Sequence, residues 1–137
     1  MRKAPVAAVI LTLLSAETVM AEDRIRITSP WGEVMADLAD NDAARALAKM
    51  LPTTLRMSDH LRQEKTGNLP SPLPEAPRRR DFSPGTLGLW GSGDFVIYYR
   101  GGRVPQQGIV VLGQTTGDVS IFDRAGEVEI HLAPLAP

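Results

Sequence analysis

The chain has 137 residues, of which 43% are hydrophobic and 23% charged, a composition typical of one globular domain. The absence of cysteine excludes disulfides, thiolate metal ligands, thiol nucleophiles and a lipid-modified N-terminal cysteine. The formal net charge of −1 gives no electrostatic attraction for a polyanion, so we expect no nucleic-acid partner.

Residues 1–21 predict a secretory signal peptide. After a basic start, an apolar run covers residues 6–14, and Val19-Met20-Ala21 closes the segment with a small residue. The run is well short of the roughly 20 residues that span a bilayer, so a retained membrane helix is the weaker interpretation. We expect cleavage after Ala21, a mature domain of residues 22–137 without a membrane anchor, and a location in the periplasm or outside the cell.

Residues 24–38 predict an opening β-hairpin. Ile25 and Ile27 alternate with polar neighbours, Ser29-Pro30-Trp31-Gly32 has turn chemistry, and the alternation resumes from Val34 to Leu38. Each strand should therefore bury one face.

A helix and a further strand should follow. Asn41 and its two aspartate neighbours can cap a helix, apolar residues recur from Ala43 to Leu51, and Pro52 ends the pattern. Strand alternation returns over residues 53–58.

Residues 59–85 lose all periodicity. Five prolines remove backbone donors and resist both helix and central strand: Pro70, Pro72, Pro74, Pro77 and Pro84. We expect a long surface loop, and loops of this length are usually functional or disordered.

The C-terminal half returns to strands. Residues 86–90 and 95–99 flank a glycine-rich turn, 109–112 form a continuous apolar run, and 128–132 alternate. Residues 117–125 are ambiguous, because Asp118 could cap a short helix or the segment could be a strand. With about seven strands and one or two helices, the pattern predicts a mainly β, closed or nearly closed antiparallel barrel.

Several segments taken together resemble the bacterial cyclophilin-like family. The similarity runs from Arg24 to Leu132 and rests on the helix with its proline stop, on Leu55-Arg56-Met57-Ser58-Asp59, Glu64-Lys65, Leu69-Pro70, Pro84-Gly85-Thr86-Leu87-Gly88-Leu89-Trp90 and Phe95-Val96-Ile97-Tyr98-Tyr99. This resemblance implies an eight-stranded cyclophilin-like β-barrel with helices closing its ends.

The catalytic signature of prolyl isomerases is missing. Isomerases of this fold carry Phe-His-Arg and Gln-Gly-Gly-Asp segments and a later Trp and His cluster, whereas this chain has only Gln107-Gly108 as a fragment. No catalytic residue is therefore carried over from the resemblance.

Four residues are candidates for ligand binding. Arg56 could donate to a ligand from a strand, although a charged residue in such alternation usually faces solvent. Trp90, Tyr98 and Tyr99 lie close together on one hairpin and could line a groove or fill a core. Because alternation separates the two tyrosines, one should point inward and the other should be exposed.

Other candidate sites are weaker. His60 and Glu64 are four residues apart and would share a helix face, but the only other histidine, His131, is on the last predicted strand, so we expect no metal site and no cofactor. The three arginines Arg78, Arg79 and Arg80 should be hydrated in their loop. Hydrolase, nucleotide-binding and zinc-protease motifs are absent.

These observations favour an exported barrel that acts as a binding or accessory module for a peptide or a small molecule. Its ligand should lie on the outer barrel face near Arg56, Trp90 and Tyr98 or Tyr99, bordered by the proline-rich loop. The alternative is a divergent peptidyl-prolyl cis-trans isomerase that assists the folding of exported proteins. A catalyst of unrelated chemistry on the same barrel ranks last, because fold does not confer function.

Overall fold

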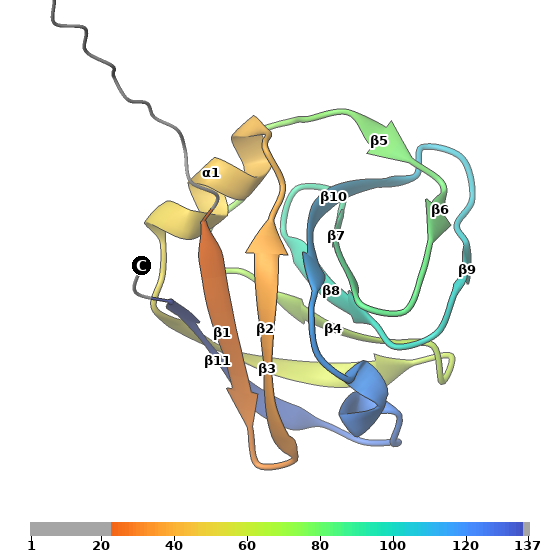
Figure 1. The fold of residues 1–137 in the computed structure, drawn as a ribbon. Coiled ribbons are helices and arrows are strands. Elements are labelled where there is room, and N and C mark those ends of the chain that lie inside the picture. Colours follow the sequence, from red (N-terminus) through yellow and green to blue (C-terminus); the bar gives the residue numbers. More distant parts are fainter. Residues whose placement is uncertain (1–22, 136–137) are drawn as a thin grey trace, which may run out of the picture.

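Eight antiparallel strands close into a barrel in the computed structural model, which describes residues 23–135 (Figure 1). Their spatial order is β2-β1-β11-β3-β4-β8-β7-β10, and β10 pairs back with β2 to close the ring. The strands are β1 (Arg24–Ser29), β2 (Gly32–Leu38), β3 (Thr53–His60), β4 (Glu64–Asn68), β7 (Thr86–Trp90), β8 (Asp94–Tyr98), β10 (Ile109–Thr115) and β11 (Val128–Pro134). The predicted barrel is confirmed, whereas the predicted signal peptide lies outside the described residues.

The opening hairpin and the helix form as the sequence predicts. Ile27 pairs with Val34 across β1 and β2, and both side chains are buried in the barrel. Helix α1 (Asp42–Lys49) begins where Asn41 Oδ1 accepts a hydrogen bond from the Ala44 amide at 2.8 Å, which satisfies a free donor of the first turn. Asn41 also donates to the Val111 carbonyl, which anchors the start of the helix to β10.

The two helical elements lie at opposite ends of the barrel (Figure 1). A short 3-10 helix, η1 (Val119–Phe122), resolves the ambiguity over residues 117–125. The Asp118 side chain accepts from the Ser120 amide at 2.9 Å, and Val119 and Phe122 are buried. Neither described helix is long and apolar enough to cross a membrane.

Strand β4 contradicts the prediction of an unbroken loop over residues 59–85. It lies between β3 and β8, where Lys65 pairs with Asp59 on one side and Ile97 on the other. Its sequence, Glu-Lys-Thr-Gly-Asn, contains no apolar residue, so it carries no hydrophobic alternation. The strand forms nevertheless because Glu64 and Lys65 are both buried with polar partners.

The remaining proline-rich segment runs along the outer wall instead of extending into solvent. Leu69 and Leu73 are buried, and their amides donate to carbonyls in the turn between β7 and β8. Strand β5 (Arg78–Arg79) pairs with β10, and β6 (Asp81–Phe82) pairs with β9 (Gly102–Arg103) in a second, two-stranded sheet. Residues 69–85 therefore lie against the outer surface of the barrel, and we call this segment the cover.

The three consecutive arginines of this segment are not simply hydrated, which corrects the expectation for them. Each donates to a backbone carbonyl: Arg78 to those of Gly91 and Gly108, Arg79 to that of Asp81, and Arg80 to that of Val104. Because the bonds of Arg78 and Arg80 reach distant parts of the chain, they hold the cover in place.

The cover creates a second hydrophobic core outside the barrel. Its ring pair is Phe82 and Tyr98, whose centroids lie 3.7 Å apart with an interplanar angle of 21°. The members of this outer core are Phe82, Val96, Tyr98, Val104 and Ile109, with Trp90 packed against them. The barrel thus has an apolar interior and one apolar patch on its wall that the cover hides.

Candidate functional site

The two tyrosines lie on opposite sides of the barrel wall, but neither is exposed. Tyr98 faces outward into the outer core and is fully buried, whereas Tyr99 belongs to the interior core and is 6% exposed. The prediction that the two side chains point to opposite sides of the strand is confirmed. The prediction that one of them is exposed to solvent is wrong. The outward ring is buried because Phe82, from the cover, stacks on it.

Trp90 and Arg56 occupy different parts of the wall. Trp90 is half-buried at the end of β7, beside the outer core. Arg56 is exposed on β3, where its Nε lies 3.8 Å from Glu127 Oε1 in a solvent-exposed ion pair. Such pairs contribute little to stability, and Arg56 remains a surface residue.

A surface pocket of about 420 Å³ opens beside Trp90. Pairing between neighbouring strands brings the lining residues together. His60 pairs with Glu64, Glu64 pairs with Tyr98, and Asp94 pairs with Trp90. The lining residues are His60, Glu64, Thr66, Trp90, Gly91 and Asp94. Of the four residues predicted to bind a ligand, Trp90 lines this pocket.

Glu64 is a buried carboxylate in the wall of the pocket, with an exposed fraction of 2%. Its Oε2 lies 3.1 Å from His60 Nδ1, and its Oε1 accepts from Gln63 Nε2 at 2.5 Å. His60 and Glu64 meet across the β3–β4 hairpin and not on a helix face, which corrects that expectation. The hairpin turns at Leu61 and Arg62, which both have left-handed φ angles.

The hydroxyl of Tyr98 is buried, and among residues 23–135 no hydrogen bond to it has standard geometry. Burial, and then the negative charge of Glu64, raise the pKa of this phenol above its usual value, whereas a weak hydrogen-bonding contact with Trp90 lowers the pKa. The hydroxyl therefore interacts with Trp90 and Glu64, two residues that line the pocket.

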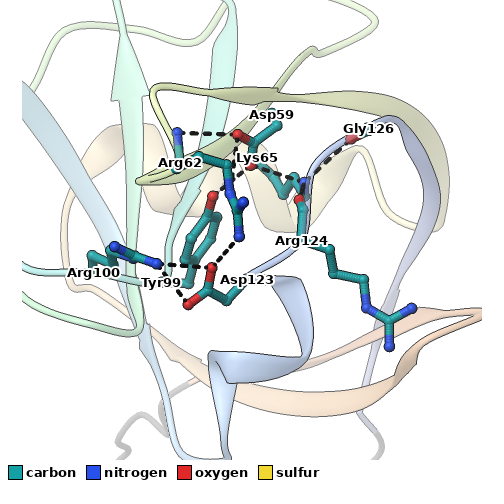
Figure 2. Close-up of polar contacts among 8 residues, drawn as sticks. All are labelled: Asp59, Arg62, Lys65, Tyr99, Arg100, Asp123, Arg124 and Gly126. Carbon is teal, nitrogen blue, oxygen red and sulfur yellow. Dashed lines mark hydrogen bonds and ion pairs between the residues drawn. The ribbon is translucent and has the colours of Figure 1, made fainter.

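A second polar cluster lies inside the barrel, at the end nearer η1 (Figure 2). The Nζ of Lys65 is 3.0 Å from Asp59 Oδ1 and also donates to the carbonyls of Arg124 and Gly126. Tyr99 donates its hydroxyl to the same Asp59 oxygen at 2.5 Å. Figure 2 shows these groups converging from β3, β4 and the segments after β8 and η1.

The charges of this cluster shift the pKa values of its members. Burial by itself would raise the pKa of Asp59, but hydrogen bonds from Tyr99 and Lys65 outweigh it and hold the pKa below its usual value. Burial, together with Asp59, raises the pKa of Tyr99 to about 12. At the rim, the hydrogen bond from Arg62 lowers the pKa of Asp123, which also pairs with Arg100 at 3.0 Å. The cluster satisfies its own charges, and we assign it a structural role.

His131 lies away from the pocket, with its Nδ1 2.9 Å from Thr54 Oγ1. In the part of the chain from residue 23 to residue 135, no three histidine, aspartate or glutamate side chains gather where they could hold a metal ion.

Sequence reasoning missed Glu64, Thr66 and Asp94 as pocket residues. They are polar residues on strands, a pattern that ordinarily marks a solvent-facing side. One signal was available in the sequence, the spacing of His60 and Glu64. Assigning these two residues to a hairpin instead of a helix would have placed them side by side on the barrel surface.

Comparisons with known proteins support the fold. The model of the cyclophilin-like family matches residues 27–133. The solution structure of a hypothetical protein from Archaeoglobus fulgidus is similar with a TM-score of 0.66 and 17% sequence identity, covering 83% of this chain and 95% of that chain. No curated protein is significantly similar to the chain in sequence. The structural similarity at this identity concerns the fold alone.

Proposed function

This chain belongs to the cyclophilin-like family, and from that premise we propose that its barrel is an exported binding module for a peptide or a small molecule. The observation that carries the proposal is the pocket on the outer wall between His60 and Trp90. Its volume of about 420 Å³ is within the range of ligand sites, and it combines an aromatic side chain with polar groups.

The site that we propose differs from the one expected from sequence. Trp90 stays as the aromatic wall, and Tyr98 supports it from the outer core. Tyr99 faces the barrel interior and Arg56 is not among the lining residues, so neither is assigned to ligand contact. His60, Glu64 and Asp94 take their place.

Binding can be tested with protein produced from the full-length sequence and labelled with nitrogen-15. We expect a fragment or peptide ligand to shift the Trp90 indole resonance and to leave that of Trp31 in place. Trp90→Ala should weaken binding at least about tenfold, because aromatic anchors carry much of the binding energy at such sites. Arg56→Ala is the matched surface control and should leave the affinity unchanged; shifts confined to residues far from Trp90 would contradict the proposal.

The alternative function, a divergent prolyl isomerase, makes a different prediction. Catalysis must lower a rotational barrier of about 18–20 kcal/mol, and it needs an apolar pocket for the ring and a donor that favours the twisted amide. The pocket beside Trp90 carries two carboxylates, and Arg56 is paired with Glu127 outside it. We therefore expect no acceleration in a protease-coupled assay on a proline-containing peptide. Acceleration that Arg56→Ala abolishes would establish the isomerase instead.

A further inference from the structure

The pocket is rich in hydrogen-bond acceptors and negative charge. Glu64 and Asp94 contribute carboxylates, and Thr66 contributes a hydroxyl. His60 Nδ1 lies 3.1 Å from Glu64 Oε2, which leaves Nε2 as the other hydrogen-bonding atom of the ring. A ligand that brings N–H donors and positive charge would complement this lining.

The carboxylate of Asp94 has no salt-bridge partner within residues 23–135, although most of the acidic side chains there are paired. It is exposed at the start of β8, opposite Trp90 in the hairpin register. An unpaired carboxylate at the rim of a pocket is available to a ligand, whereas most other surface carboxylates already have a cation.

Nearby basic residues do not neutralise the pocket. Arg78 reaches the Gly91 carbonyl, but its guanidinium is also paired with Glu75 at 3.1 Å. Lys65 follows Glu64 in the chain, yet its ammonium points to the barrel interior. His60, the basic side chain in the lining, lies against Glu64, so the unpaired carboxylate of Asp94 gives the pocket its negative field.

Trp90 adds a further feature that suits a cation. The half-buried indole of Trp90 lines the pocket, and an aromatic face attracts an ammonium or guanidinium group held within about 6 Å. Tyr98 pairs across the strands with Glu64 and belongs to the outer core against which Trp90 packs, so it supports the indole from behind.

We propose that this pocket binds an organic cation, an ammonium or guanidinium group such as the side chain of a lysine or arginine in a peptide. This inference rests on the proposed binding function and specifies its ligand class. A free alkylamine offers the same chemistry, so the test includes both sources.

The test uses short peptides that differ at one position: arginine, its neutral analogue citrulline, lysine, the uncharged norleucine, and proline. Butylamine and butylguanidine serve as free cations. Titrations followed at the Trp90 indole should show the arginine and lysine peptides binding at least about tenfold more tightly than the citrulline and norleucine peptides. Binding should weaken as salt is raised, because screening reduces the attraction between charges. If butylamine or butylguanidine binds as tightly as the charged peptides, the site is assigned to small amines. If the charged peptides bind more tightly, the site is assigned to peptides. Either result supports the inference.

Asp94→Asn should weaken arginine-peptide binding about tenfold and leave citrulline-peptide binding unchanged. Glu64→Gln should act in the same direction, and the exposed Asp94 variant keeps the test decisive if the buried one fails to fold. Glu127→Gln, which removes a carboxylate elsewhere on the barrel surface, is the control and should have no effect.

The outcomes separate the two proposals. Equal binding of charged and neutral peptides at Trp90 would overturn the cation preference and leave the binding function standing. If no peptide and no free amine perturbs Trp90 while ligands of other classes do, the cation inference fails alone. If nothing binds there, both proposals fail.

Discussion

The ammonium group of Lys65 lies inside the barrel, where three oxygen atoms accept its hydrogen bonds. One of them carries the charge of Asp59, and the other two are backbone carbonyls. A buried ammonium without such partners would cost several kcal/mol, so the fold depends on this arrangement. Tyr99 restrains Asp59 through its hydroxyl and links the ion pair to the interior core.

Asp59→Asn should lower the free energy of unfolding at pH 7 on the order of 3 kcal/mol, because Lys65 keeps its charge and loses its countercharge. The folded-state pKa of Asp59 lies below its usual value, so the wild-type advantage is complete above about pH 4 and is lost as the pH falls through the lower folded pKa. Urea denaturation of both proteins from pH 7 to pH 3 should show the two stabilities converging.

Asp123→Asn is the control for this prediction. Asp123 pairs with Arg62 and Arg100, whose side chains are about half exposed, so its removal should have a much smaller effect. A stability gap between wild type and Asp59→Asn that stays constant down to pH 3 would contradict the role assigned to the ion pair.

At the scale of the elements, strand β4 decides the geometry of the pocket. It places Glu64 and Thr66 on the outer wall and Lys65 in the interior. Its close approach to β3 requires glycine at residue 67, because a Cβ there would lie 2.7 Å from the Arg56 carbonyl oxygen and 3.0 Å from Met57 Cγ. The first contact is with backbone, which cannot rotate away.

Gly67→Ala should therefore lower the free energy of unfolding by about 1–3 kcal/mol, the range found when atoms are forced into a packed site. Gly93→Ala is a matched control, because a Cβ at Gly93 would meet no atom within 4 Å, and its effect should stay within about 0.5 kcal/mol. Thermal or urea unfolding measures both. Equal stability of the two variants would show that β3 and β4 can separate without cost.

At the scale of the whole molecule, the closed barrel has a filled interior, so the site that we propose lies on its outer surface. The interior is filled by apolar side chains and the Lys65 cluster, and the cover seals one outer patch. The pocket beside Trp90 lies next to the outer core that the cover buries. From the N-terminal segment we propose that the protein works outside the cytoplasm.

Export has a direct test. In a bacterium that expresses the full-length sequence, we expect the protein in the periplasmic fraction or the medium, with Glu22 as its N-terminal residue. N-terminal sequencing or intact mass measures this. A protein that stays in the cytoplasm with residues 1–21 attached would contradict the prediction, and a charged residue in place of Val9 should block export by interrupting the apolar run.

The sequence by itself determined the positions of most strands, the hairpins over residues 24–38 and 86–99 and the capped helix after Asn41, and its motifs carried the resemblance to the family. The strands, the hairpins and the helix depend on local periodicity and on side chains that act within a few residues of their own position. Only the tertiary structure decided that β4 is a central strand, that both tyrosines are buried, and that His60 and Glu64 meet at a pocket with Trp90. The reason is that alternation shows which side of a strand a residue faces, whereas distant segments decide what covers that side and which buried charges find partners.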